Sequence, residues 1–501
     1  MSILVERWLA RAADQHAAIL GADTRASYED VVAGSRRVAA ALLGARATLD
    51  GERVALLVGP SAAFVEAFFG VLLAGGCVVV LSPLHPAPET RYFCDDAEVR
   101  TVLVSEELAH LAAPLATDFD VRALAPLLAT TPAPALREVV PRSDASPALQ
   151  LYTSGTTGKP KGAVITHANL AVQQQLVGEA WGFREGDVLL HALPLHHMHG
   201  LAIALLTALG AGATTRLTTF DAPAIWEALA GATVFMGVPA MYHRLLLAET
   251  AVDDTTRARW AAGARQLRLA TSGSAALPVT IAERWRAITG RIPLERFGMT
   301  EIGVGITNAL EGERFPGCVG LPLPTVETRI VGDDGQEGPL GELWIRGPSV
   351  FAGYHRRSAE TEAAFVADPA GGAPWFRTGD TVTREPGGAF KILGRTSVDI
   401  LKSGGYKLSA LEIEEVLREH PGVGEVAVVG VPDEAWGERV VACVVRKGPD
   451  ATTDAAALRA FAKERLAAYK VPKDVLFLDE LPKNALGKVV KPALLAQLKA
   501  V

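Results

Sequence analysis

The chain has 501 residues, of which 49% are hydrophobic and 21% charged, and its formal net charge is -7 at pH 7. This length is too great for one hydrophobic core and predicts about three domain-sized units, while the acidic balance argues against a nucleic-acid partner. No apolar run is long enough to cross a bilayer, and residues 1–15 carry charges where a signal peptide would be apolar. We therefore expect a cytoplasmic protein without a membrane partner.

The first three-quarters of the chain alternates short apolar runs with helical patterns. Residues 53–58, 62–74 and 77–81 have the pattern of a strand, a helix and a second strand. Similar patterns recur at 101–105, at 233–238 with 240–247, and at 267–270 with 279–288. This alternation predicts a layered α/β fold.

The pattern changes after residue 395, where glycines and charges cluster before an acidic helical segment begins. Apolar runs and helical patterns then follow at 425–430, 440–445, 454–468 and 491–499. We expect a large α/β domain over residues 1–395 and a small α+β domain over residues 396–501.

The four cysteines, Cys77, Cys94, Cys318 and Cys443, are far apart and lack the spacing of metal ligands. Cys77 and Cys443 lie in apolar, strand-like runs. We expect buried, reduced thiols rather than disulfides or a metal site.

Residues 151–162 combine three glycines, four Ser/Thr hydroxyls and two lysines in one loop after an apolar run. Glycines let the backbone approach an anion, and hydroxyls and lysines bind its oxygens, so the loop predicts a nucleotide or polyphosphate ligand. A Walker-type loop fits less well, because it needs a hydroxyl residue after its lysine and Lys159 precedes Pro160. An ordinary surface loop is the plainer alternative. The candidate phosphate-binding residues are Thr153, Ser154, Gly155, Thr156, Thr157, Gly158 and Lys159.

This loop resembles, nearly letter for letter, the phosphate loop of the adenylate-forming enzymes, which include acyl-CoA synthetases, nonribosomal-peptide adenylation domains and luciferases. Further motifs extend the resemblance, in the same order, over essentially the whole chain. It implies a large domain of several subdomains that binds ATP and an acid, and a small domain that rotates about a hinge. It also implies Mg2+ as a cofactor and coenzyme A as the co-substrate.

Residues 297–301 follow a strand-like run at 291–295 and place a hydroxyl beside a carboxylate. Such a pair suits a phosphate and its magnesium ion, which prefers one or two carboxylates with phosphate oxygens. By resemblance, Thr300 contacts the α-phosphate and Glu301 binds the metal, while Asp380 accepts hydrogen bonds from the ribose hydroxyls. Beyond the loop, the implied nucleotide site comprises Ser274, Ala275, Arg296, Phe297, Gly298, Met299, Thr300, Asp380 and Arg395.

The family's hinge segment begins at Gly394 and Arg395. Many members have Asp or Lys at the hinge, whereas this chain departs from the pattern, and we expect the hinge among Ser397, Val398 and Asp399. The glycine-rich segment that follows is implied to face coenzyme A, through Ser403, Gly404 and Gly405.

Residues 482–488 resemble the loop that bears the family's catalytic lysine, here Lys488. Adenylation joins two negatively charged reactants, so a mobile ammonium between the carboxylate and the phosphate would stabilise the transition state. The implied catalytic residues are Lys488, Thr300 and Glu301.

Three segments, residues 237–244, 294–298 and 312–320, resemble those of malonyl-CoA synthetases. An arginine fork pairs with a carboxylate through two hydrogen bonds. We hypothesise that Arg244, with Arg296 and His199, binds the second carboxylate of malonate or a 2-substituted malonate, and that Ser272 also lines the pocket. The plainer alternative makes Arg244 a solvated helix residue and His199 a core histidine.

The sequence thus predicts an ATP-dependent acid–thiol ligase that forms malonyl-CoA through an acyl-AMP intermediate, releasing AMP and pyrophosphate. Alternatives are a ligase for a monocarboxylic acid and an adenylation enzyme that loads a carrier protein. Only thirteen residues follow Lys488, so we expect no fused carrier domain. A luciferase-like oxidising enzyme and a non-catalytic nucleotide sensor are further alternatives.

Overall fold

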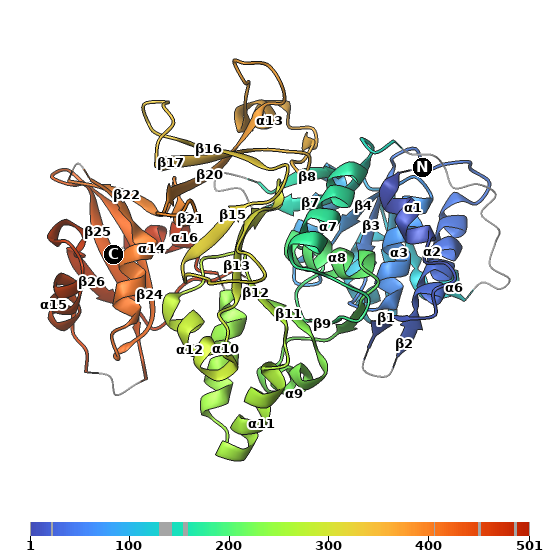
Figure 1. Cartoon of the computed structure of the whole chain (residues 1–501). Coiled ribbons are helices and arrows are strands. Elements are labelled where there is room, and N and C mark those ends of the chain that lie inside the picture. Colours follow the sequence, from blue (N-terminus) through green and yellow to red (C-terminus); the bar gives the residue numbers. More distant parts are fainter. Residues whose placement is uncertain are drawn as a thin grey trace.

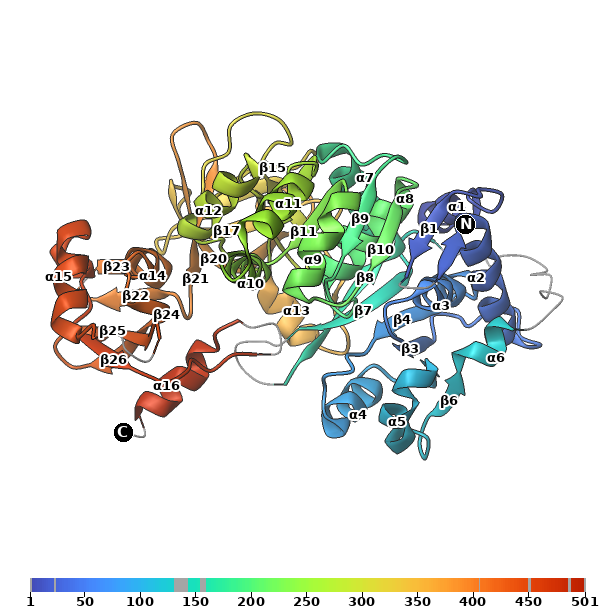
Figure 2. The same cartoon turned by 90° about the horizontal axis from the view of Figure 1, so that it is seen from below.

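The computed structural model describes residues 2–21, 24–129, 143–153, 159–404, 406–448, 452–484 and 488–499. Helices and strands alternate through a large N-terminal domain. A small C-terminal domain, orange to red in Figures 1 and 2, lies at one end of the molecule. This confirms the expected α/β architecture.

One sheet of the large domain has seven strands in the order β18–β8–β7–β4–β3–β5–β6. Their bounds are β3 (Arg53–Leu57), β4 (Cys77–Val80), β5 (Thr101–Val104), β6 (Asp120–Ala123), β7 (Pro147–Thr153), β8 (Lys161–Thr166) and β18 (Gly353–Tyr354). Alternate residues of β3 pack into two separate hydrophobic clusters, one on each face. A parallel strand that is covered on both faces is apolar throughout, which explains the continuous apolar run at 53–58.

A second, fourteen-stranded sheet has the order β16–β17–β20–β21–β15–β14–β13–β12–β11–β9–β10–β1–β2, with β19 paired to β20. Its strands are β1 (Ala17–Leu20), β2 (Arg25–Ser27), β9 (Val188–His191), β10 (Thr214–Leu217), β11 (Val234–Gly237), β12 (Leu269–Ser272), β13 (Leu294–Met299), β14 (Gly303–Thr307), β15 (Cys318–Pro322), β16 (Glu327–Val331), β17 (Leu340–Arg346), β19 (Phe365–Val366), β20 (Trp375–Arg384) and β21 (Phe390–Arg395). Strands β11, β12 and β13 are parallel, and the pairing becomes antiparallel at β14.

The helices of the large domain cover these sheets (Figure 1). They are α1 (Ile3–Leu9), α2 (Tyr28–Leu43), α3 (Ala62–Leu73), α4 (Ala87–Asp96), α5 (Ala109–Ala112), α6 (Leu124–Leu128), α7 (His167–Ala180), a π-helix (His199–Leu206), α8 (Thr207–Gly210), α9 (Ala222–Ala228), α10 (Pro239–Thr250), α11 (Asp254–Ala264), α12 (Val279–Thr289) and α13 (Ser358–Ala364). Trp226 stacks on Trp260 and Trp285, which fastens α9 to α11 and α12. Across the described ranges, no helix is both long enough and apolar enough to span a membrane.

The small domain is a five-stranded sheet with helices on both faces. Its elements are β22 (Ile400–Ser403), β23 (Tyr406–Ser409), α14 (Ala410–Arg418), β24 (Val423–Asp433), β25 (Gly437–Arg446), α15 (Ala455–Arg465), β26 (Asp474–Phe477) and α16 (Lys491–Lys499). Leu401, Ile413 and Leu458 belong to the core on one face, and Val429 and Leu494 to the core on the other. Buried residues from Leu401 onward therefore form cores of their own.

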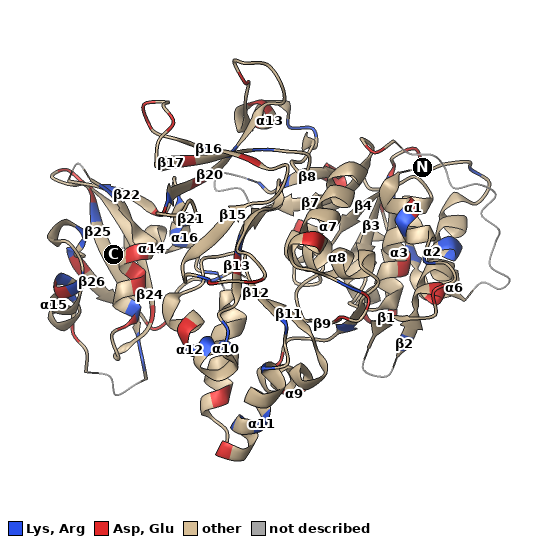
Figure 3. Ribbon diagram, viewed as in Figure 1, with Lys and Arg blue, Asp and Glu red and all other residues tan. Residues whose placement is uncertain are grey.

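Polar contacts join the two domains. The Ser409 hydroxyl donates to the carbonyl of Leu393 at 2.6 Å, and the backbone N–H of Thr280 donates to Glu415 at 3.3 Å. Lys407 also pairs with Asp333 of the large domain. Figure 3 shows acidic and basic residues interspersed over both domains, so such pairs form without a segregated charged face.

Candidate active site

The predicted phosphate loop connects the antiparallel strands β7 and β8. Thr153 ends β7 opposite Lys161, whereas Ser154, Gly155, Thr156, Thr157 and Gly158 lie outside the described residues. Beyond the loop, the Lys159 ammonium lies 5.3 Å from the centre of the Tyr92 ring. The Lys161 ammonium lies 5.1 Å from that of Tyr354. Two cations thus stand at the loop, where an anion would gain from them.

Glu301 is a buried carboxylate in the turn between β13 and β14. The Tyr354 hydroxyl donates to its Oε1 atom at 2.8 Å. Burial raises the pKa of Glu301, and the charges of Arg395 and Lys161 act in the opposite direction. A buried carboxylate beside two cations suits a ligand that brings both negative charge and a metal ion.

The motif around Glu301 differs from its predicted form, because Phe297, Gly298 and Met299 belong to strand β13 itself. The strand-like run was placed at 291–295, but β13 begins at Leu294 and continues into a hairpin with β14. A Cβ atom at Gly298 would lie 2.1 Å from the carbonyl oxygen of Gly303. Only glycine permits this close return of the chain, which brings Thr300 and Glu301 to the hairpin's tip.

Asp380 and Arg395 face each other across the antiparallel strands β20 and β21. The Arg395 Nε atom lies 3.3 Å from Asp380 Oδ1, and its Nη1 donates to the carbonyl of Thr378 at 2.6 Å. Burial raises the pKa of Asp380 to about 6, against the lowering effect of Arg395 and of Lys488. The predicted ribose carboxylate is therefore held by an arginine and lies within the field of the predicted catalytic lysine.

Lys488 belongs to the small domain and is exposed. Its backbone is fixed by Asn484, which accepts from the Lys488 N–H at 3.0 Å and donates to its carbonyl at 2.9 Å. The charge of Lys488 is one of the effects that lower the pKa of Asp380, a residue of the large domain.

The expected hinge residues lie between β21 and β22. Asp399 accepts from the backbone N–H of Arg395 at 3.0 Å, whereas Ser397 and Val398 sit in the turn between them. The other Asp399 oxygen accepts from Lys491 at 2.6 Å, and Lys491 also pairs with Glu414 at 2.7 Å. Asp399 therefore links Arg395, which precedes the expected hinge residues, to Lys491 at the start of α16.

The predicted coenzyme A residues lie at the end of β22. Ser403 is buried, Gly404 donates its N–H to the carbonyl of Trp436 at 2.8 Å, and Gly405 lies outside the described residues. A Cβ atom at Gly404 would lie 3.0 Å from the Trp436 ring, and the φ angle of +58° also favours glycine.

The second region of the site is a cluster of buried polar side chains around the end of β12. Arg296 is 6% exposed, and its Nε and Nη2 atoms have no hydrogen-bond partner among the described residues. The same holds for Ser272 Oγ and His199 Nε2. Burial lowers the pKa of Arg296 to about 10. Burial and, to a lesser degree, Arg296 hold the pKa of His199 well below its usual value.

The turn after β12 assembles this pocket. A Cβ atom at Gly273 would lie 2.5 Å from the Arg296 guanidinium carbon, so the guanidinium packs directly on the glycine. The Ser274 hydroxyl lies 3.2 Å from His199 Nδ1, and Ala275 follows in the exposed part of the turn. His199 itself begins a π-helix, a rare geometry that recurs at functional sites.

Arg244 is exposed, whereas Arg296 and His199 are buried. Arg244 belongs to α10, and its guanidinium lies 4.6 Å from the centre of the Phe220 ring. Throughout the described part of the chain it forms no hydrogen bond or ion pair. The role of Arg244 stays a prediction, whereas Arg296 has the burial and the unpaired donors of a ligand-binding group.

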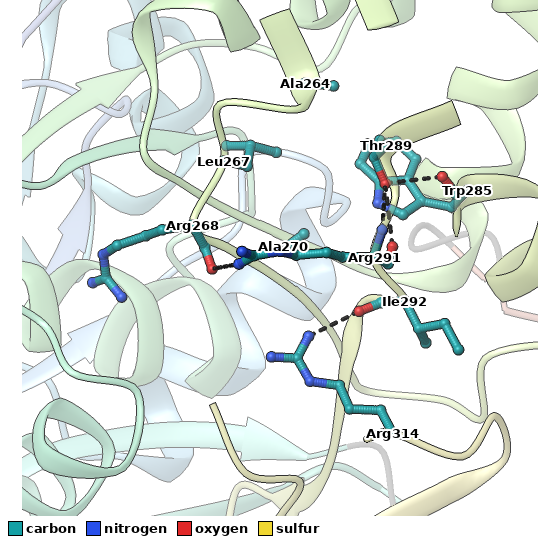
Figure 4. Close-up of a pocket in the computed structure, with 9 residues that line it drawn as sticks. All are labelled: Ala264, Leu267, Arg268, Ala270, Trp285, Thr289, Arg291, Ile292 and Arg314. Carbon is teal, nitrogen blue, oxygen red and sulfur yellow. Dashed lines mark hydrogen bonds between the residues drawn. The ribbon is translucent and has the colours of Figure 1, made fainter. Parts of the chain in front are cut away.

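Arg314, from the segment 312–320, lines a small cavity (Figure 4). It donates to the carbonyls of Ile292 at 2.8 Å and Leu310 at 2.6 Å. The cavity volume of about 10 Å³ leaves room for no more than about one water molecule. Arg314 therefore fastens a loop to the start of β13 and has no room for an organic ligand beside it.

Sequence reasoning missed Tyr354, Lys491 and Trp436. Tyr354 bonds a carboxylate 53 positions away in sequence, and Lys491 one 92 positions away. Neither lies in a recognisable motif, so no local pattern could have found them.

Comparison with known proteins gives consistent matches. The profile of the AMP-binding enzymes matches residues 5–355, and that of the AMP-binding enzyme C-terminal domain matches residues 412–488. The mitochondrial malonate–CoA ligase of Bos taurus is 39% identical, over 96% of this chain and 88% of its own. The crystal structure of ATP-bound MatB from Rhodopseudomonas palustris superposes with a TM-score of 0.90 at 35% identity, covering 100% and 99% of the two chains. A malonyl-CoA ligase in a ternary product complex with methylmalonyl-CoA and AMP gives 0.66 at 37% identity, covering 94% and 97%.

Proposed function

Since this chain belongs to the AMP-binding enzyme family, we propose that it is an ATP-dependent acid–thiol ligase that forms malonyl-CoA. The observation that carries the choice of acid is the buried, unpaired guanidinium of Arg296, with His199 and Ser272 beside it. A buried charge without a partner is strongly unfavourable, so such a pocket favours an acid with a second carboxylate. The relatives named above, which act on malonate or its derivatives, support the same choice.

In the first half-reaction, a carboxylate oxygen of malonate attacks the α-phosphorus of ATP, and the bond to the leaving pyrophosphate breaks. Arg296 and His199 hold the second carboxylate, Asp380 accepts from the ribose hydroxyls, and the Lys488 ammonium neutralises charge between the attacking and transferred groups. The field of Lys488 at Asp380 supports this placement. The better superposition on the ATP-bound relative supports our proposal that the present domain arrangement belongs to this step.

Glu301 is the residue that would hold Mg2+. Within the described residues no group of three or more His, Cys, Asp or Glu side chains could hold a metal ion, so phosphate oxygens and water would complete the shell. Mg2+ is commonly bound by one or two carboxylates plus phosphates, and it would offset the charge of the leaving pyrophosphate.

In the second half-reaction, the thiol sulfur of coenzyme A attacks the acyl carbon and AMP leaves with the bridging oxygen. We assign the segment Ser403–Gly405 to the approach of the thiol and Ser397–Asp399 to the domain rotation between steps. The backbone N–H of Arg395 bonded to Asp399 would have to release or turn in that rotation.

A coupled assay of AMP release tests the proposal across malonate, methylmalonate, acetate, propionate, succinate, hexanoate and 4-coumarate, each with coenzyme A and ATP. We expect malonate to give the highest kcat/KM, because a site that hydrogen-bonds a polar group rejects analogues without it by roughly 10⁴-fold. A monocarboxylic acid as the best substrate would refute the dicarboxylate assignment, and acid-independent AMP release would refute the ligase.

A further inference from the structure

Three consecutive residues at the end of β12 each contribute differently to the pocket. Ser272 places a buried hydroxyl there, Gly273 supports the guanidinium of Arg296, and Ser274 contacts His199. Ser274 differs from the other two residues, because its side chain acts on the pocket only through its contact with His199.

The backbone of Ser274 is in the left-handed region, with a φ angle of +69°. This conformation is costly for residues other than glycine and persists when the surrounding structure requires it. A glycine would adopt it freely, but a glycine has no hydroxyl. The strained serine therefore indicates that the hydroxyl beside His199 matters.

A neutral imidazole has one donor nitrogen and one acceptor nitrogen, so the partner of one nitrogen fixes the role of the other. His199 is buried and lies beside a cation, both of which favour its neutral form. If the Ser274 hydroxyl donates to Nδ1, the proton of the ring is on Nε2. The Nε2 atom is the one that is buried without a partner among the described residues.

We propose that Ser274 is a positioning residue that holds His199 as its Nε2–H tautomer, so that His199 and Arg296 together donate to the second carboxylate of the acid. This rests on the proposed function. In the opposite tautomer the lone pair of Nε2 would face a carboxylate and repel it. Ser274 thus sets specificity without touching the substrate.

The test compares Ser274→Gly and Ser274→Ala with the full-length wild-type enzyme. Glycine keeps the backbone conformation and removes the hydroxyl, whereas alanine removes the hydroxyl and keeps the strain. The readout is the ratio of kcat/KM for malonate to that for propionate, from which any effect on ATP binding cancels. We expect both variants to lower this ratio by about 10–100-fold, the value of one hydrogen bond to a charged group.

The second measurement is made on the wild-type enzyme itself, and a variant serves only to assign the signal. Ring ¹⁵N shifts of the wild-type enzyme with labelled histidine, assigned by the peak lost in His199→Gln, report the tautomer directly. We expect the Nε2–H form. An Nδ1–H form, or an unchanged substrate ratio in both serine variants, would overturn the role of Ser274 while leaving malonate as the substrate. A wild-type enzyme without preference for malonate over propionate would instead overturn the proposed function itself.

Discussion

The nucleotide side and the acid side of the site differ in how their polar groups are satisfied. On the nucleotide side, Glu301 is bonded to Tyr354 and Asp380 is paired with Arg395. On the acid side, Arg296 and Ser272 have buried polar atoms without a partner among the described residues. The described groups of the first region thus have protein partners, whereas buried atoms of the second would gain partners from a ligand.

This difference favours our proposal that substrate specificity resides on the acid side. A group that already has a hydrogen-bond partner in the protein contributes little binding free energy to any ligand, so it discriminates weakly between ligands. A buried donor without a partner loses hydration in the empty protein and regains a hydrogen bond only from the right ligand, so it discriminates strongly. The following predictions test this contrast.

The largest effect is expected for Arg296→Met, which removes the buried charge and keeps the volume. The preference for malonate over propionate should fall by about 10³-fold or more, because the pocket becomes apolar. Arg244→Met is the matched comparison, since Arg244 is exposed and lies over Phe220. AMP release with both acids measures the ratio. If the preference for malonate falls strongly in Arg244→Met and not in Arg296→Met, Arg244 is the residue that binds the second carboxylate.

Next in size, Lys488→Gln should slow malonyl-AMP formation by about 10²–10³-fold, because an uncharged amide cannot neutralise the transition state. Malonate-dependent pyrophosphate release measures this step. Lys483→Gln serves as the control, since Lys483 is in the same loop but pairs with Glu425. If Lys488→Gln forms malonyl-AMP at the wild-type rate, the lysine has no catalytic role. The comparison between the nucleotide side and the acid side would then no longer include a catalytic group on the nucleotide side.

Gly273→Ala tests the acid side without removing any polar group. The added methyl group would meet the Arg296 guanidinium and displace it. We expect the KM for malonate to rise about tenfold, which matches the loss of one good hydrogen bond. The KM for ATP should change less. Isothermal titration of malonate and of ATP measures the affinity for each ligand. Equal losses of affinity for both ligands would contradict a pocket that contacts only the acid.

The smallest effect concerns pH. Asp380 must be ionised to accept two ribose hydroxyls, and its pKa of about 6 predicts that kcat/KM for ATP rises with pH through about 6. Arg395→Met removes a cation that favours the ionised form, so the acidic limb should move to higher pH, by roughly one unit. Arg384→Met is the control, because Arg384 ends the strand that carries Asp380 but lies over Phe390, and it should leave the limb in place. If the acidic limb of the pH profile does not move in Arg395→Met, Asp380 is not the group whose ionisation sets that limb.

Short motifs are the basis on which the sequence predicts the nucleotide side. Thr153, Glu301 and Asp380 each lie in a contiguous signature, because a loop or hairpin that binds phosphate needs neighbouring residues of fixed type. The strand–helix units also followed from periodicity, and β3, α3 and β4 formed where the apolar runs predicted them.

The acid side was less predictable, because its members come from separate segments and burial decides their roles. Arg244 and Arg296 both stand beside apolar residues in sequence, yet Arg244 lies on the outer face of a helix and Arg296 in a buried strand. The predicted trio therefore included one residue that the structure leaves at the surface. Likewise, the tyrosine that bonds Glu301 is 53 positions away from it in sequence, and only folding brings the two together.

The ion pairs of Lys491 have a mechanical consequence. Lys491 follows Lys488 by three residues. It forms ion pairs with Asp399, in the expected hinge, and with Glu414 on α14. These ion pairs tie the start of α16, three residues after Lys488, to the expected hinge and to α14. If the small domain rotates as proposed, α16 and Asp399 would move as one unit near the predicted catalytic lysine.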